Sequence, residues 1–141
     1  MLKATYSINE ISRMTGLTTR TIRNYLNDGI VTASKTEGKW VFSQEEFLAM
    51  LDNPYIAPAI RAKNNAPVFD FIKADRKDDS EVCLIIDRCI ADAAAEPLIR
   101  RVCGLMQDVR NVEFRFEKKG KNIRLIFTGD EAQIRRIYAE I

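Results

Sequence analysis

The chain has 141 residues, with 22 lysines and arginines against 20 aspartates and glutamates, and it contains no histidine. This length suits one ordinary domain or two small ones, and the lack of histidine removes the side chain that most often serves as a general base. No run of about 18 apolar residues and no signal-peptide pattern is present, so the sequence predicts no membrane association. We therefore expect a cytoplasmic protein that is not an enzyme and that uses no cofactor.

Two short helices separated by a brief turn are predicted near the N-terminus. Ser7 and Glu10 fit a reciprocal capping box that opens the first helix, and this helix ends at Gly16. Thr18 fits the N-cap of the second helix, and Gly29 fits its left-handed C-cap. A turn this short fixes the angle between the helices and is typical of a helix-turn-helix.

The second helix, residues 18–28, has two chemically different faces. Ile22, Tyr25 and Leu26 share one side at helical spacing and are expected to face a core. The other side carries hydroxyl, cationic and amide groups: Thr19, Arg20, Arg23, Asn24 and Asn27. Because such groups neutralise phosphates and hydrogen-bond to base edges, the pattern predicts a recognition helix for the major groove.

A polar run followed by alternating apolar residues predicts a β-hairpin wing over residues 34–42, with Gly38 at its tip. Lys35 and Lys39 flank this tip, so we expect them to reach the DNA backbone or minor groove beside the recognition helix. Trp40 either covers the hydrophobic seam or stacks on a sugar or phosphate. A second capping box directly after the hairpin predicts a third helix that packs beneath the first two.

A family resemblance is carried by the motif Gly16–Tyr25, the helix end Gly29-Ile30 and the wing segment Gly38–Ser43. Together these segments resemble a MerR-type winged helix-turn-helix. The resemblance implies a transcriptional regulator that binds double-stranded DNA. The residues expected to contact DNA are Thr18, Thr19, Arg20, Arg23, Asn24, Tyr25, Lys35, Lys39 and Trp40.

Three functions are compatible with this N-terminal region. The first is a sequence-specific transcriptional regulator, and the second is an excisionase-like architectural protein that bends DNA for recombination, since Gly38-Lys39-Trp40 is also similar to phage excisionases. The third is a protein-interaction module that no longer binds DNA. The target site separates the first two functions, and salt-dependent binding to duplex DNA separates both from the third.

A compositional break follows the third helix and predicts two domains. The expected arrangement is a DNA-binding domain at residues 1–53, a linker at residues 54–67 and a second domain at residues 68–141. Because Pro54 and Pro58 interrupt the segment where a long coiled coil would start, the second domain is expected to form a homodimer or to sense a small-molecule effector.

Hydrophobic patterns in the second domain predict the order β-α-β-β-α. The expected elements are a strand at 81–86 buried on both faces, a helix from about Glu96 to Asp108, strands at 112–117 and 123–127, and a helix from Asp130 onward. Pro97 favours a helix that begins late, after an irregular turn at residues 92–95. This order resembles a ferredoxin-like or ACT-like domain that lacks its final strand, so the whole chain is predicted to be an α+β protein.

In that arrangement the strand at 123–127 lies between the other two, which leaves the strand at 81–86 with an open edge. An open apolar edge promotes association with other chains. The apolar segment Val68–Ile72, as a strand or a short helix, is a candidate to cover this edge in its own subunit or in a second copy.

No metal site is predicted. The cysteines lie in apolar or helical contexts, which favours reduced core thiols over a metal or redox sensor: Cys83, Cys89 and Cys103. A cluster of acidic residues is interleaved with cations, which favours a solvated loop over a metal site: Asp75, Asp78 and Asp79.

Overall fold

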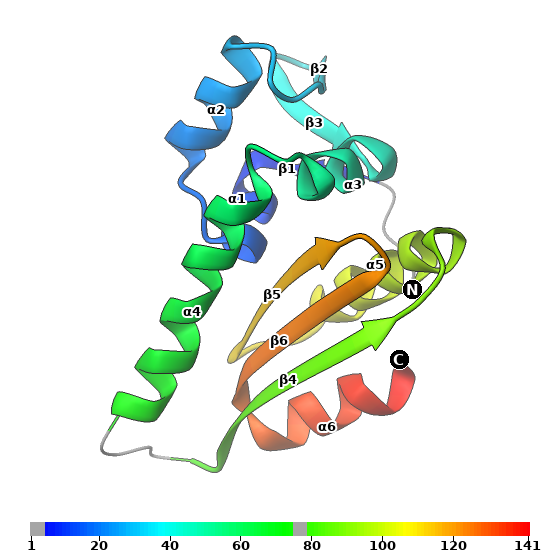
Figure 1. Ribbon diagram of the computed structural model, residues 1–141. Helices are drawn as coiled ribbons and strands as arrows, with labels where there is room; N and C mark the ends of the chain where they lie inside the picture. Colours follow the sequence, from blue (N-terminus) through cyan, green and yellow to red (C-terminus); the bar gives the residue numbers. More distant parts are fainter. Residues whose placement is uncertain (1–4, 75–78) are drawn as a thin grey trace.

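The computed structural model describes residues 5–74 and 79–141. The N-terminal part contains β1 (Thr5–Ser7), α1 (Ile8–Thr15), α2 (Thr19–Asn27), β2 (Ser34–Thr36), β3 (Lys39–Ser43) and α3 (Gln44–Asp52). A long helix, α4 (Ala57–Lys73), leads to the C-terminal part, which contains β4 (Glu81–Cys89), α5 (Asp92–Met106), β5 (Val112–Lys119), β6 (Asn122–Asp130) and α6 (Glu131–Glu140). The predicted mixture of helices and strands is therefore confirmed, with the helix-turn-helix at the N-terminal end (Figure 1).

Capping residues set the starts of two N-terminal helices as predicted. At α1 the Glu10 amide donates to Ser7 Oγ at 3.1 Å, and Glu10 Oε1 accepts from the Ser7 amide at 3.0 Å. The same reciprocal pair joins Ser43 and Glu46 at the start of α3. Each box satisfies amide groups that the first turn of a helix leaves without partners, so these starts are specified locally.

The N-terminal sheet is a small antiparallel sheet in the order β1-β3-β2. Glu37 and Gly38 form the turn between β2 and β3 with φ of 53° and 78°, and a two-residue turn with both φ values positive matches the twist of a hairpin. The predicted hairpin is therefore confirmed. The third strand, β1, pairs Tyr6 with Phe42 and was not predicted, because a three-residue strand leaves too little alternation to recognise.

The C-terminal sheet is antiparallel in the order β4-β6-β5, so the third strand of this region lies in the centre, as predicted. Figure 1 shows α5 and α6 on the same face of this sheet. Arg101 of α5 pairs with the Glu140 carboxylate of α6 at 3.3 Å. Ile99, Ile134 and Ile137 are buried beneath these helices and form much of the core with the strands.

The expectation that residues 81–86 are buried on both faces is wrong. β4 is an edge strand whose only paired neighbour among the described strands is β6, and Ile85 remains 47% exposed. The segment Val68–Ile72 does not cover this edge, because it is helical and belongs to α4, which packs against β5 and β6 instead. The face of the sheet opposite α5 and α6 is partly covered by α4, and Ile126 on this face is buried.

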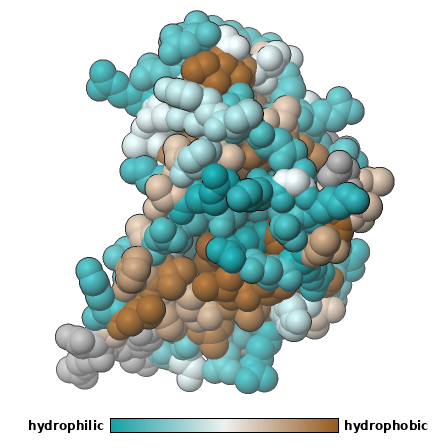
Figure 2. Space-filling view, in the orientation of Figure 1, coloured by the Kyte–Doolittle hydropathy of each residue, from teal (hydrophilic) through white to brown (hydrophobic). Residues whose placement is uncertain are grey.

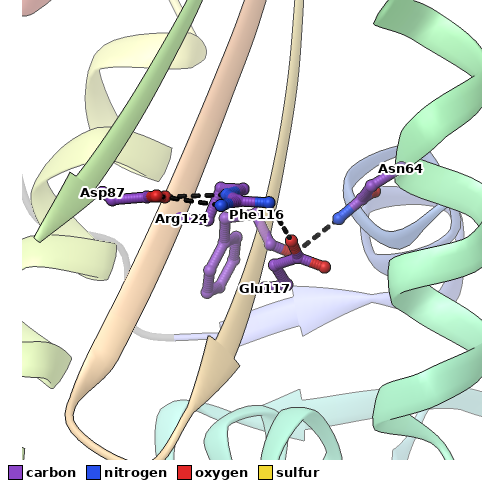
Figure 3. A network of polar contacts seen from close by, with 5 residues as sticks. All are labelled: Asn64, Asp87, Phe116, Glu117 and Arg124. Atoms are coloured by element: carbon purple, nitrogen blue, oxygen red, sulfur yellow. Dashed lines mark hydrogen bonds and ion pairs between the residues drawn. The ribbon is translucent and has the colours of Figure 1, made fainter.

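A chain of polar contacts crosses the face of the sheet opposite α5 and α6 (Figure 3). Arg124 of β6 donates to both carboxylate oxygens of Asp87 on β4, at 2.7 and 2.9 Å, and its Nη1 lies 3.5 Å from Glu117 Oε1 on β5. Asn64 of α4 donates to the Phe116 carbonyl at 3.5 Å. The hydrogen bonds from Arg124 hold the pKa of Asp87 below its usual range. These contacts link all three strands and connect the sheet to α4.

The linker expected at residues 54–67 differs from what is observed, because the chain is helical from Ala57 onward. Pro58 lies in the first turn of α4, where its missing N–H is not needed. Pro67 lies inside the helix and cannot donate to the carbonyl of Lys63, four residues earlier. Arg115 of β5 donates to that carbonyl at 2.8 Å, so a strand satisfies the group that the proline leaves free.

The late start expected for the helix before β5 is also wrong. α5 begins at Asp92 and carries Pro97 in its second turn, with the Ala94 amide bonded to the Ala91 carbonyl at 2.9 Å. Ala95 and Ile99 are buried on the core side of α5, and this packing stabilises the helix although Pro97 removes one hydrogen bond. The last helix, α6, begins as predicted, with Asp130 accepting from the Gln133 amide at 2.9 Å.

One hydrophobic core runs through both parts of the chain. The ring of Phe47 on α3 meets that of Phe116 on β5 edge to face, with centroids 5.6 Å apart. Met14 of α1 and Cys103 of α5 bring their sulfur atoms within 3.5 Å. Because these side chains are buried only when both parts are folded, the helix-turn-helix is mounted on the C-terminal sheet and not tethered by a flexible segment.

Candidate nucleic-acid interface

The turn between α1 and α2 consists of Gly16, Leu17 and Thr18. Gly16 has φ +80°, which ends α1, and its amide donates to the Ser12 carbonyl at 2.9 Å. Ser12 Oγ in turn donates to the Leu17 carbonyl at 2.6 Å. Leu17 is 3% exposed and anchors the turn in the core. Local bonds and one buried side chain thus fix where α2 begins.

Both ends of α2 match the sequence prediction. Thr18 is the N-cap, and its Oγ1 accepts from the Thr21 amide at 3.1 Å. Gly29 adopts φ +73° after the helix, and the Ile30 amide returns to the Tyr25 carbonyl at 2.9 Å. This is the Schellman arrangement, which satisfies carbonyls at the helix end. The helix is therefore short and defined at both termini.

The two faces of α2 separate as predicted. Ile22 and Leu26 are buried, whereas the cations and amides on the opposite side are exposed: Arg20, Arg23, Asn24 and Asn27. Neither the Arg20 nor the Arg23 side chain forms an ion pair or hydrogen bond with any residue in the described ranges 5–74 and 79–141. Their guanidinium groups are consequently available to an external anion.

Tyr25 lies between the two faces. Its ring is half-buried and meets Tyr55 edge to face, with centroids 6.1 Å apart. Burial, and then the neighbouring Tyr55, raises the pKa of Tyr25. Tyr25 is thus placed to support α2 against the segment before α4, and it contributes less free surface than the arginines.

The wing presents its lysines to solvent. Lys35 and Trp40 are cross-strand partners in the hairpin, and Lys35 Nζ lies 4.8 Å from the centroid of the Trp40 ring. This cation–π contact keeps the indole half-covered, while Lys39 next to it stays exposed. Figure 1 shows the β2–β3 hairpin and α2 at the same end of the molecule, far from α6.

The predicted contact residues therefore fall into two groups at one end of the fold. Thr18, Thr19, Arg20, Arg23 and Asn24 belong to the N-cap and outer side of α2, and Lys35, Lys39 and Trp40 belong to the hairpin. Sequence reasoning did not select Arg13, an exposed cation in the last turn of α1. Nothing in the local sequence pattern distinguishes this arginine from a solvated side chain.

The cysteines do not gather into a site. Cys103 is buried, Cys83 is half-buried with its thiol pKa raised by burial, and Cys89 is exposed. Within the described ranges, no group of three or more His, Cys, Asp or Glu side chains is arranged to hold a metal ion. Of the predicted acidic loop, Asp79 is exposed, and Asp75 and Asp78 lie outside the described residues.

Comparison with known families identifies the N-terminal part. Residues 5–54 match the family described as Helix-turn-helix domain. This segment is a DNA-binding helix-turn-helix domain. The match covers β1 to α3, and it ends just before α4. No curated protein and no solved structure matches the chain. None of the helices in the described part is both long and apolar enough to cross a membrane.

Proposed function

We propose that the protein is a sequence-specific transcriptional regulator of the MerR type that acts by binding DNA and not by catalysis. The observation that carries the proposal is the outer side of α2, where Arg20 and Arg23 are exposed without intramolecular partners in the described residues. Asn24 is exposed on the same side of α2 and offers donor and acceptor groups for base edges. In the proposed complex α2 enters the major groove and the wing contacts the adjacent backbone.

The direct test replaces Arg20 and Arg23 by alanine, singly and together. Each substitution is expected to weaken binding to the selected duplex by about 1–3 kcal/mol if the arginine is bidentate to guanine, with the thermal unfolding midpoint unchanged. Arg136→Ala, an exposed arginine of α6 at the other end of the molecule, is the matched control. Wild-type affinity in the double variant would rule out α2 as the recognition helix.

A second assay separates the regulator from an excisionase-like architectural protein. The wing segment Gly38-Lys39-Trp40 supports the second candidate, because a lysine and an aromatic side chain at a hairpin tip suit contact with bent DNA. Selection of bound duplexes from a random library, followed by measurement of the bend angle, distinguishes them. A strongly bent site at a recombination attachment sequence would favour the architectural role over the regulator.

We propose further that the protein acts as a homodimer, through a C-terminal part that resembles an incomplete ferredoxin-like domain. Large apolar side chains are exposed along α4 and β4: Phe69, Ile72 and Ile85 are 59%, 71% and 47% exposed. Figure 2 shows hydrophobic side chains gathered over the lower half of α4 and the neighbouring sheet. A second copy would cover this surface and the unpaired edge of β4.

Light scattering of the full chain at tens of micromolar tests the dimer. We expect twice the monomer mass for the wild type and monomer mass for Ile72→Glu/Ile85→Glu, because two buried charges oppose association. Tyr138→Glu, at a 51% exposed position on α6, should remain dimeric. A monomeric wild type would rule out the proposed homodimer.

A further inference from the structure

A cleft of about 760 Å³ lies between the helix-turn-helix domain and the C-terminal sheet. Its lining combines aromatic and sulfur-containing side chains with two arginines: Tyr6, Met14, Met106, Phe114, Arg13 and Arg115. This volume falls within the range of about 300–1,000 Å³ that is typical of small-molecule sites. We propose that the cleft binds a small organic carboxylate with an apolar body and, resting on the proposed function, that its occupancy changes the affinity for DNA.

Arg115 supplies the reason for an anionic ligand. Its Nη1 donates to the Lys63 carbonyl at 2.8 Å, but its Nε is buried and has no acceptor among the described residues. The guanidinium forms no ion pair with any carboxylate in the described part of the chain. A partly buried cation with neither counterion nor a full set of acceptors is unfavourable, and a carboxylate would correct both deficits through a bidentate contact.

The acidic residues of the cleft do not take that place. Glu10 Oε1 is occupied by the Ser7 amide at 3.0 Å, as part of the capping box. Glu113 is exposed, and its carboxylate forms no ion pair with Arg115 or another described residue. Arg13 adds a second cation, which is exposed and forms no ion pair with a described residue. The cleft therefore offers two arginines to a carboxylate, one partly buried and one at the surface.

The apolar part of the lining favours a ligand that has an apolar body as well as a charge. Met14 and Cys103 meet at 3.5 Å between their sulfur atoms, and Phe114 beside them is 5% exposed. Thioethers adapt to the shape of an apolar partner because their side chains are flexible and polarizable. Three further apolar side chains of the lining are only half-buried: Met106, Val109 and Val112. An inorganic anion would leave them in contact with water, whereas an aliphatic or aromatic carboxylate would cover them.

The cleft also touches the turn that positions α2. Gly16, Leu17 and Thr18 line it, and Thr18 is the N-cap of the recognition helix. The Arg115 guanidinium packs so closely on Gly16 that a Cβ added there would overlap Nη1. A carboxylate that draws Arg115 toward the cleft therefore changes the support beneath the turn. Such coupling is reciprocal, so ligand and DNA must alter each other's affinity by the same factor.

Isothermal titration of the full chain with octanoate, without DNA, tests the ligand class. The neutral comparison is 1-octanol, which has the same number of carbons. We expect octanoate to bind about tenfold more tightly than 1-octanol, because only the carboxylate forms charge-assisted hydrogen bonds. Equal binding of the two compounds, or no binding of octanoate at millimolar concentration, overturns the proposal. Inorganic phosphate that competes as well as octanoate overturns the requirement for an apolar body.

Variants locate the site. Arg115→Gln should weaken octanoate binding about tenfold and leave 1-octanol unchanged, since glutamine retains a donor for the Lys63 carbonyl but has no charge. Arg13→Gln, at an exposed position, serves if Arg115→Gln is unstable and should reduce the preference for octanoate over 1-octanol. Arg136→Gln on α6 is the control. Unchanged octanoate binding in both cleft variants would show that the ligand binds elsewhere.

The coupling is measured separately, as duplex affinity with saturating octanoate and with 1-octanol. A several-fold change with octanoate alone is expected, and the change should disappear in Arg115→Gln. Octanoate that binds the cleft without altering duplex affinity overturns the coupling. A protein that binds octanoate but no duplex DNA refutes the proposed function and leaves the carboxylate site intact, so the two failures are distinguishable.

Discussion

The outer side of the helix-turn-helix domain and its inner side are stabilised in opposite ways. On the outside, α2 and the wing are defined by caps, turns and hydrogen bonds between residues close in sequence, and their charged side chains face solvent. On the inside, α1 and α3 complete their core with side chains from β5 and α5, far away in sequence. The surface that would meet DNA is thus set locally, and the stability beneath it comes from the second half of the chain.

Removing the Phe116 ring, which joins the C-terminal sheet to the helix-turn-helix domain, should have the largest effect on stability. Phe116 is fully buried and meets both Phe47 and Phe114 with ring centroids 5.6 Å away. Phe116→Ala should lower the free energy of unfolding by about 3–5 kcal/mol, because it leaves a cavity between the two parts. Urea unfolding followed by circular dichroism gives the loss in stability.

Fluorescence of the single tryptophan shows whether Phe116→Ala also destabilises the helix-turn-helix domain. Trp40 lies in the wing, so its fluorescence reports on the helix-turn-helix domain although the substitution is in the C-terminal sheet. Fluorescence and circular dichroism should shift together, as expected for one cooperative unit. A fluorescence transition that keeps its wild-type midpoint would mean that the parts unfold independently. Tyr138→Ala, at a 51% exposed site, should change stability by less than about 0.5 kcal/mol.

Alanine substitutions at two glycines with nearly the same φ distinguish the cost of backbone strain from the cost of a packing clash. Gly16 and Gly38 have φ of +80° and +78°, but only Gly16 has neighbours that an added Cβ would strike, namely Arg115 and Lys63. Gly38→Ala should cost about 1–2 kcal/mol, the price of a left-handed L-residue. Gly16→Ala should cost about 1–3 kcal/mol more, because the clash is added to the same strain. Equal losses by thermal or urea unfolding would show that the turn is not held against β5.

Substitutions in the wing should change stability least, and they should weaken DNA binding instead. Lys35→Ala/Lys39→Ala should leave the unfolding free energy within about 1 kcal/mol of wild type, since only an exposed cation–π contact is lost. Duplex affinity should fall modestly at every sequence, and the slope of log affinity against log salt should become shallower. Titrations at low and high salt measure both quantities. An unchanged slope would remove the wing from the interface.

This contrast also explains what the sequence could predict. The ends of α2 and the starts of α1 and α3 were predicted correctly because each depends on capping residues within a few positions, such as Ser7 with Glu10. The hairpin followed from the glycine at its tip and from alternation, which are local signals that do not depend on the rest of the chain. The central position of β6 followed from the resemblance of the element order to a ferredoxin-like domain.

The errors concern long-range contacts. The linker expected at residues 54–67 is helical through Pro67, because the carbonyl that this proline leaves free is satisfied by Arg115 from a distant strand. The apolar run of β4 suggested burial on both faces, yet Ile85 in this strand remains 47% exposed. For the candidate site, the exposed face of α2 was visible in the sequence. The cleft beneath it was not, because Met14 and Arg115 meet only after the chain has folded.

The edge-to-face pair of Phe47 and Phe116 has a consequence for how the protein is made. During synthesis the residues of α1, α2 and α3 leave the ribosome first, while the aromatic and sulfur side chains that complete their core are still to be translated. Until β5 emerges, the nascent chain exposes an apolar surface that chaperones can recognise. The capacity to bind duplex DNA should therefore arise late in translation, and products of premature termination should be cleared without ever competing for the target site.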